Sequence, residues 1–204
     1  MLFTDSYKTI LQLSSGAFSD KGSKFLAFIY PVRAEGEVKE ILSRLRKEHP
    51  KANHHCWAFR LSPDRSVFRV SDDGEPSGTA GRPILNTLLS YDVTNVLAVV
   101  VRYFGGTLLG VPGLINAYKK ATIDALDQAA IIELSISSVY EISFDHSKMN
   151  DTMKIIKDEG LKVRNQIFDN LSVIQVEIRL SQQEKVLGRF KNIDGLQVKY
   201  LSTS

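Results

Sequence analysis

The chain has 204 residues, 43% of them hydrophobic, and a single cysteine. This length suits one large or two modest domains, and a lone cysteine excludes an internal disulfide and fits a reducing cytoplasm. Even an apolar run such as Val96–Val101 is too short to span a membrane, so we expect a cytoplasmic protein without a membrane partner. The net charge of +3 excludes a strongly basic chain, and binding to RNA would need a local cationic patch.

The first third of the chain predicts a hairpin, a helix and two strands. Tyr7–Leu13 and Lys24–Val32 have strand character, and we expect them to pair. Glu35–Glu48 carries apolar residues at helical spacing, with glutamates early and basic residues late. Ala52–Leu61 alternates in the manner of a strand, and Ser66–Val70 is a shorter strand that follows a turn.

Two histidines stand beside the only cysteine in the strand Ala52–Leu61. His54, His55 and Cys56 are all metal-ligating types, but neighbouring residues of a strand point to opposite faces of a sheet. Zinc sites use three or four converging ligands, which this cluster cannot provide. We therefore expect no metal, with one histidine packed and the other facing a groove.

The stretch Ser71–Pro83, SDDGEPSGTAGRP, is a specialised loop, because its carboxylates, glycines and prolines build neither a helix nor a strand. Its spacing matches neither an EF-hand nor a Walker A loop. Two interpretations stay open for its polar residues: they shape the loop through bonds to backbone amides, or they form a polar site. These residues are Asp72, Asp73, Glu75 and Thr79.

Pro83 marks a helix start, so Arg82 is expected near a helix N-terminus that can hold an anion. The same order of elements then recurs. Asn95–Tyr103 is typical of a buried strand and leads into GGTLLGVPG, Gly105–Gly113, where Pro112 marks the next helix. Its glycines are not spaced as GxGxxG, so we expect no dinucleotide or other cofactor.

The last third predicts the order βαββαβ, the signature of a ferredoxin-like domain. Its turn is expected at Asp169 and Asn170, and its first helix is expected to bury Met149, Met153 and Ile156. The expected strands are Ser137–Phe144, Lys162–Phe168, Leu171–Leu180 and Leu196–Leu201, and the expected helices are Ser147–Glu159 and Gln182–Lys191. The predicted class is α+β with two domains, residues 1–134 and 137–204, joined by a linker at Ile131–Ser138.

Four motifs carry a resemblance to a known family. They are KGSKF at Lys21–Phe25, HHC at His54–Cys56, SDDGEPSGTAGRP at Ser71–Pro83 and VVVRYFGGTLLGVPGL at Val99–Leu114. Together they resemble the IMPACT/YigZ family over residues 1 to about 134. The resemblance implies a first domain like domain 2 of ribosomal protein S5, and a pair of domains like the last two of the translocation factor EF-G.

The resemblance also implies a bacterial-type member without an RWD domain. Eukaryotic members that carry an RWD domain compete for an activator of a starvation-responsive kinase that acts on translation initiation. The family has no established catalytic residues, so none is assigned here.

Two functional hypotheses follow. The first is a non-enzymatic regulator of translation that binds RNA, the ribosome or a translation-related protein, with anions held near two helix starts. Its candidate anion-binding residues are Lys24, His54, His55, Arg82, Arg102, Gly105 and Gly106. The alternative is a metal-assisted hydrolase that uses Asp72, Asp73 or Glu75 with one of the histidines.

Overall fold

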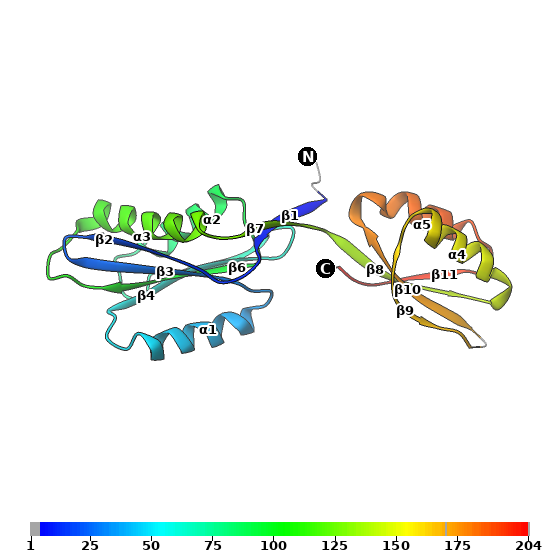
Figure 1. Ribbon diagram of the computed structural model, residues 1–204, viewed down its shortest axis with the longest axis horizontal. Helices are drawn as coiled ribbons and strands as arrows, with labels where there is room; N and C mark the ends of the chain where they lie inside the picture. The colour runs from blue at the N-terminus through cyan, green and yellow to red at the C-terminus, as the bar shows by residue number, and fades with distance from the viewer. Residues whose placement is uncertain (1–4, 170, 204) are drawn as a thin grey trace. The chain divides into compact units, whose positions relative to one another are not determined.

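The computed structural model describes residues 5–169 and 171–203, and these form an α+β chain of two compact units (Figure 1). The N-terminal unit covers residues 7–134. The C-terminal unit comprises the described residues from Ser135 onward together with Asp5 and Ser6. Asp5 belongs to it because its carboxylate accepts hydrogen bonds from the backbone and the hydroxyl of Ser181.

A five-stranded sheet in the order β2-β3-β6-β4-β5 forms the centre of the N-terminal unit. All neighbouring strands are antiparallel. The strands are β2 (Ser14–Asp20), β3 (Ser23–Pro31), β4 (His54–Leu61), β5 (Val67–Ser71) and β6 (Val96–Tyr103). A separate two-stranded sheet joins β1 (Ser6–Ile10) to β7 (Ile131–Ser135).

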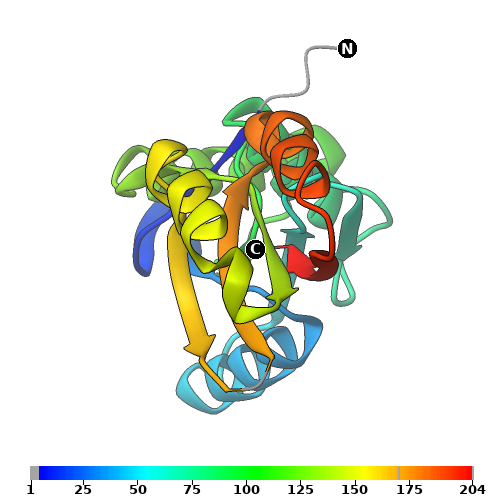
Figure 2. The same ribbon diagram turned by 90° about the vertical axis from the view of Figure 1, so that its right-hand side faces the viewer.

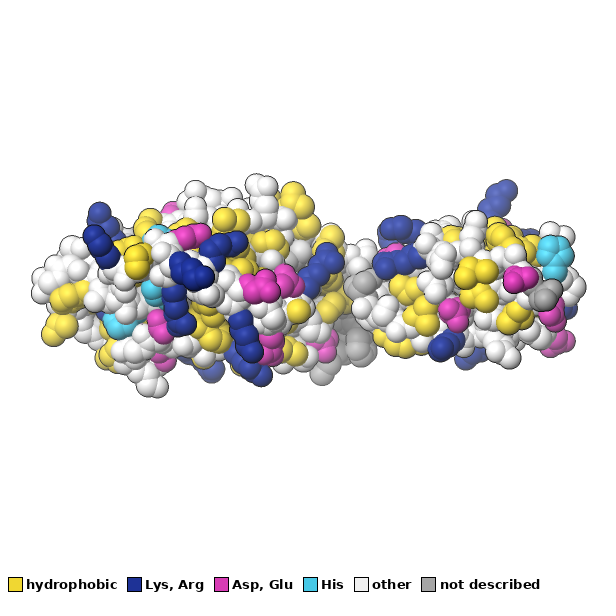
Figure 3. All heavy atoms as spheres, turned by 90° about the horizontal axis from the view of Figure 1, so that it is seen from below, with side chains coloured by type: hydrophobic (Ala, Val, Ile, Leu, Met, Phe, Trp, Pro, Cys, Tyr) yellow, Lys and Arg dark blue, Asp and Glu magenta, His cyan; other side chains and the backbone are white. Residues whose placement is uncertain are grey.

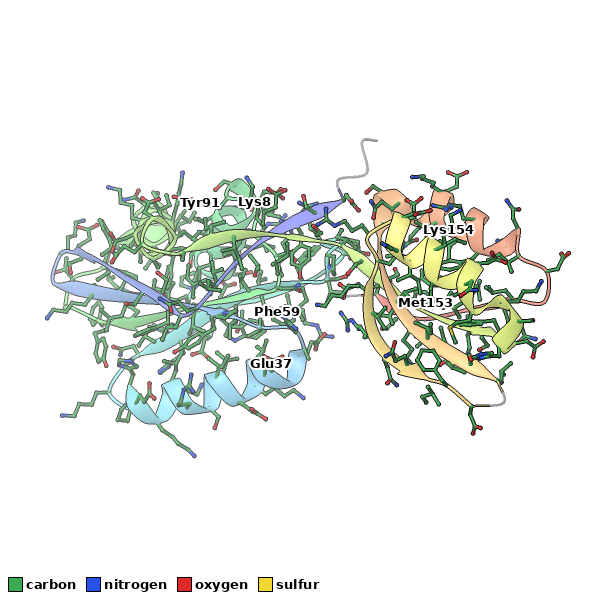
Figure 4. The ribbon with its side chains drawn as sticks, turned by 45° about the vertical axis from the view of Figure 1, so that its right-hand side comes forward. Lys8, Glu37, Phe59, Tyr91, Met153 and Lys154 are labelled. Atoms are coloured by element: carbon green, nitrogen blue, oxygen red, sulfur yellow. The ribbon has the colours of Figure 1, made fainter. Side chains whose placement is uncertain are left out.

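Helices cover both faces of the five-stranded sheet. Figure 1 shows α2 (Gly81–Ser90) and α3 (Gly110–Asp127) on one face and α1 (Glu35–Glu48) on the other. Phe59 lies in the layer between the sheet and α1 (Figure 4). Strand β6 contributes alternate side chains to both layers, which explains its continuous apolar sequence.

The predicted hairpin at the start of the chain is wrong in its first strand. The hairpin is β2–β3, closed by a tight turn at Lys21 and Gly22, whereas β1 pairs with β7. Strand β2, SSGAFSD, lacks an apolar alternation because it packs closely on α3. A Cβ at Gly16 would lie 2.3 Å from the backbone nitrogen of Ala125, so only glycine allows the backbones of β2 and α3 to approach this closely. A strand in such close contact needs small residues at the contact and shows no hydrophobic alternation.

The boundary between the two units, after Leu134, falls inside the predicted linker Ile131–Ser138, but this segment is largely strand. Ile131–Ser135 forms β7, and β8 begins two residues later at Ser137. The exposed and half-buried side chains of β7 alternate, as expected for a strand with one solvent-facing side. The chain therefore passes between the units through paired strand rather than through a structureless connection.

The C-terminal unit has the predicted element order βαββαβ. Its antiparallel sheet runs β11-β8-β10-β9, and both helices lie on one face (Figures 1 and 2). The elements are β8 (Ser137–Phe144), α4 (Met149–Asp158), β9 (Lys162–Ile167), β10 (Ser172–Arg179), α5 (Gln183–Lys191) and β11 (Gln197–Thr203), with short 3-10 turns at His146–Lys148 and Leu180–Gln182. Of the predicted turn, Asn170 lies outside the described residues.

One core prediction in this unit is wrong. Met153 on α4 is 38% exposed (Figure 4), whereas Thr152, Ile155 and Ile156 are buried. The buried stripe follows the spacing of three and four residues from Thr152. A small threonine takes the inward position, and the larger methionine lies at its edge.

Candidate functional site

The two glycine-rich loops lie at the same end of the five-stranded sheet. In the antiparallel register Arg102 stands opposite both Phe25 and His54, and Ser71 stands opposite Trp57. The start of β4 and the ends of β5 and β6 therefore meet at one edge. We call this the glycine-loop end; it comprises the β2–β3 turn and residues 49–53, 72–80 and 104–109. Figure 1 shows the β2–β3 turn and the β6–α3 loop at the left of this unit.

The first loop opens with a tight turn. The backbone N–H of Glu75 donates to the carbonyl of Asp72 at 2.9 Å, and the central residues Asp73 and Gly74 have φ values of 43° and 90°. Two consecutive positive φ angles define a type I′ turn, for which Asp-Gly is a preferred pair. The turn separates three acidic side chains and sends each in a different direction.

The carboxylate of Asp72 occupies the N-terminus of α2. It accepts hydrogen bonds from the backbone N–H groups of Gly78, Ala80 and Gly81 at 2.8, 3.0 and 2.8 Å. Partial burial alone would raise the pKa of Asp72, but the three backbone donors together lower it below its ordinary value. The expectation of a free anion site at this helix start is wrong, because the chain supplies its own anion.

Asp73 ties the same turn to the other face of the sheet. Its carboxylate accepts from the backbone N–H of His55 at 2.7 Å and from the guanidinium of Arg46 on α1 at 3.0 Å. Its carbonyl oxygen lies 2.9 Å from Nδ1 of His54, so that ring nitrogen donates. The neutral form of His54 therefore keeps Nε2 as an acceptor, 3.9 Å from a carboxylate oxygen of Glu75.

Glu75 is the buried acid of the loop, with 8% of its surface exposed. One carboxylate oxygen accepts from Nη1 of Arg102 at 2.6 Å and from the hydroxyl of Tyr118 on α3 at 2.7 Å. The thiol of Cys56 lies 3.2 Å from that hydroxyl and 2.9 Å from the carbonyl of Asp72. Burial of a charged carboxylate is costly unless hydrogen-bond donors surround it, as they do here. Through these contacts the network connects the loop to β4, β6 and α3.

Arg102 lies between two aromatic rings. Its guanidinium carbon is 5.4 Å from the ring centre of Phe25 and 5.6 Å from that of Phe104, distances typical of cation–π contacts. Arg102 is 5% exposed, and its buried Nε has no hydrogen-bond partner among the described residues. This predicted phosphate ligand is therefore held inside the network by Glu75.

The two histidines of β4 lie on opposite faces of the sheet. His55 is buried on the α1 side, whereas His54 is half-buried beside the first loop. Burial lowers the pKa of His55 below 6.5, an effect that Asp73 opposes and Arg46 reinforces. His55 is thus the packed member of the pair.

The second loop needs glycine at one position for close contact. A Cβ at Gly105 would lie 2.0 Å from the carbonyl carbon of Gly22, so the β6–α3 loop rests directly on the β2–β3 turn. The backbone N–H groups of Phe104 and Gly105 donate to the side chains of Asn53 and Ser23 at 3.0 and 3.1 Å. Gly106 has a φ of +86° and open space where a Cβ would stand.

The predicted site residues fall into two groups. His54, Glu75 and Arg102 meet in the network, whereas Lys24 and Arg82 are exposed and have no ion-pair partner among the described residues. Thr79 is buried and donates to the carbonyl of Pro76 at 2.7 Å, so it shapes the loop.

Two residues of the network were not predicted as site residues. Tyr118 was assigned to the packing face of a helix, and Cys56 was considered only as a metal ligand. The signal for Tyr118 was present, because a tyrosine among small residues on a buried face needs a partner for its hydroxyl. No local pattern links it to Glu75, which lies 43 positions earlier.

The surface of the glycine-loop end carries more unpaired cations than unpaired acids; among the described residues its one acid with neither an ion-pair partner nor backbone N–H donors is Asp20, which is half-buried. Asp72, Asp73 and Glu75 are each engaged by internal donors. Five exposed cations at or beside this end have no carboxylate partner within residues 5–169 and 171–203: Lys21, Lys24, Lys47, Lys51 and Arg82. By contrast, cations and anions are interspersed over α1 (Figure 3).

Comparison with known proteins identifies the family. The model of the Impact N-terminal domain matches residues 21–126, which include both glycine loops and every residue of the network. The chain belongs to the IMPACT family. YigZ of Escherichia coli is 31% identical to it over 160 residues, a match that covers 78% of each chain. YvyE of Bacillus subtilis, also named as an IMPACT family member, is 34% identical over 142 residues, or 70% of this chain and 65% of that protein.

One solved structure is similar to this chain over almost its whole length. A crystal structure described as that of a hypothetical protein is 27% identical, with a TM-score of 0.72 over 98% of this chain and 99% of its own. Among the described residues, no three histidine, cysteine or acidic side chains are placed to hold a metal ion. No helix in the described part of the chain is long and apolar enough to cross a membrane.

Cys56 gives a direct test of the network. Burial is the main reason that the pKa of its thiol is raised far above the ordinary value. We expect iodoacetamide to label native protein at least about 10³-fold more slowly than protein unfolded in urea, because labelling requires the unit to open. Mass spectrometry of the single cysteine measures this rate. Labelling at the rate of an exposed cysteine would contradict the buried network.

Proposed function

We propose that this protein is a translation-associated regulator that binds RNA, including ribosomal RNA, through the glycine-loop end. The observation that supports this most is the combination of unpaired cations outside and neutralised carboxylates inside. Phosphate groups are the natural partner of exposed lysines and arginines that lack a carboxylate. Membership of the IMPACT family supports the link to translation, because eukaryotic members of this family compete for an activator of a kinase that acts on translation initiation.

The electrostatic argument depends on where each acid is used. Asp73 and Glu75 pair with Arg46 and Arg102, and Asp72 accepts from backbone N–H groups, at distances of 2.6–3.0 Å. These three acids therefore leave the five surface cations without a partner. The loop can therefore stay rigid through its acids and still present a positive surface.

The same contacts favour binding over hydrolysis. A metal-assisted hydrolase needs carboxylate oxygens that converge on one point. Here the oxygens of Asp72 point at backbone N–H groups, those of Asp73 at β4 and α1, and Glu75 faces Arg102 and Tyr118. These acids are better suited to hold the loop than to activate a water molecule.

We further propose that the two units are the domains that the sequence predicts, with limits near 1–134 and 137–204. The order βαββαβ with strands β11-β8-β10-β9 supports a ferredoxin-like C-terminal domain. The family resemblance supports an N-terminal domain like domain 2 of ribosomal protein S5. A pair of this kind would resemble the last two domains of EF-G, which fits a ribosomal partner.

Removal of two surface cations should weaken RNA binding without unfolding the protein. We expect the full chain to bind a structured RNA hairpin with a Kd below about 100 µM at low salt. Lys24→Gln/Lys51→Gln should raise that Kd about fivefold or more, because each lysine lost removes a phosphate contact. Filter binding measures both affinities.

The matched control is Lys154→Gln/Lys157→Gln, which makes the same change of net charge on exposed residues of α4. Its Kd should stay within about twofold of the unmodified chain. Equal weakening by both pairs would assign binding to bulk charge, and absence of binding below about 100 µM would refute the proposal. If the chain shows no affinity for RNA and a pull-down recovers the same partner after nuclease treatment, the partner is a protein and not RNA.

A further inference from the structure

Phe104 is an exposed aromatic residue on a rigid support. Its side chain is 46% exposed at the first position of the β6–α3 loop. The backbone on both sides is fixed, because Phe104 N–H donates to Asn53 and Gly105 N–H donates to Ser23. Gly105 also rests against Gly22, so this part of the loop has little freedom to move.

The ring is supported from inside by the buried network. The guanidinium of Arg102 lies over the ring at 5.6 Å from its centre, and Glu75 holds that guanidinium at 2.6 Å. Glu75 is in turn fixed by Tyr118. An exposed hydrophobic side chain usually needs no explanation, but a ring held on both its backbone and one face by buried polar groups is preorganised to contact a ligand.

The surroundings of the ring indicate the chemistry of that ligand. Lys51 is two residues from Asn53, the residue that binds the Phe104 backbone, and Lys24 stands opposite Tyr103 in the sheet register. Both lysines are exposed. A flat ring on a surface that also carries free cations matches a planar group joined to phosphates, which describes a nucleotide with its base unstacked.

We propose that Phe104 is a stacking platform for an unpaired RNA base, so that the glycine-loop end prefers single-stranded or looped RNA to a continuous duplex. This inference rests on the proposed RNA-binding function and specifies its substrate class. In a duplex the bases stack on one another and offer no free face, whereas an unpaired base can lie on an aromatic ring. The cations supply affinity for either form, and Phe104 supplies the preference.

The test compares two RNAs and two substitutions in the full chain. Fluorescence anisotropy gives the Kd for an unstructured RNA of about 12 nucleotides and for a blunt duplex of the same length. Phe104→Leu should weaken single-strand binding about tenfold and change duplex binding by less than about twofold, because stacking is lost while the phosphate contacts remain. Phe104→Tyr keeps a ring and should retain the preference.

A second measurement follows stacking directly. The fluorescence of 2-aminopurine within the single strand should be quenched when the unmodified chain or Phe104→Tyr binds, and not when Phe104→Leu binds. The inference is overturned if Phe104→Leu keeps single-strand affinity, or if it weakens duplex binding equally. Should the lysine pair variant lose affinity while Phe104→Leu does not, the proposed function stands and the stacking platform fails.

Discussion

Replacement of Arg102 by methionine is expected to lower the free energy of unfolding of the N-terminal unit by about 3–5 kcal/mol. Glu75 would remain buried with its negative charge, and among the described residues the Tyr118 hydroxyl is the hydrogen-bond donor that it would keep. Urea unfolding followed by fluorescence of Trp57, the only tryptophan, measures the stability of this unit.

Two further variants separate the buried pair from ordinary ion pairs. Arg69→Met breaks an exposed pair with Glu35, whose side chains are 64% and 41% exposed, and should cost about 0–1 kcal/mol. Arg102→Met/Glu75→Leu removes both buried charges and should be more stable than Arg102→Met alone. A loss below about 1 kcal/mol for Arg102→Met would contradict the buried network.

Replacement of Asp72 by alanine is the second large effect, about 3 kcal/mol. Three backbone N–H groups at the start of α2 would lose their acceptor, and the helix would lose the charge that complements its dipole. Asp64→Ala is the control, because Asp64 also accepts from a backbone N–H, that of Ser66, but is exposed. It should cost about 1 kcal/mol or less. Equal losses for the two variants would contradict the role of Asp72.

The effect of Asp72 should depend on pH. The folded pKa of Asp72 lies below its ordinary value of 3.8, so the carboxylate stabilises the folded state fully above that value. The contribution is lost as the pH falls through the folded pKa. The stability difference between the unmodified chain and Asp72→Ala should therefore be constant at neutral pH and shrink below about pH 4. A difference that persists unchanged into strong acid would contradict this explanation.

The periodicity of apolar residues predicted the helices and strands that bury only one of their sides. The helix Glu35–Glu48 and the strand Ser137–Phe144 have the predicted bounds. The helix buries apolar residues at helical spacing, and the strand buries Ile142 and Phe144 on one face. Strand β2 was missed since Gly16 is there for contact with α3, and close approach leaves no hydrophobic alternation. Met153 was misplaced because helical spacing alone does not show which of two neighbouring stripes is buried.

The candidate site was predictable in its residue types but not in its connections. The polar residues of the first loop were identified, with loop shaping and a polar site left open. Asp72 caps a helix eight residues away, and Glu75 pairs with Arg102. Both contacts depend on how strands β4 and β6 bring the loops together. No local signal contains that information. The charge of the outer surface could only be read once the internal partners of the acids were known.

The salt dependence of RNA affinity tests the central claim most directly, since it counts the phosphates that the glycine-loop end neutralises. The experiment compares the unmodified chain with a variant that carries Lys21→Gln, Lys24→Gln, Lys51→Gln and Arg82→Gln. Both are titrated with single-stranded RNA between about 50 and 200 mM salt. The slope of log K against log salt should become shallower by about 0.7 for each contact removed. An identical slope in the two proteins would show that RNA, if bound, contacts another surface.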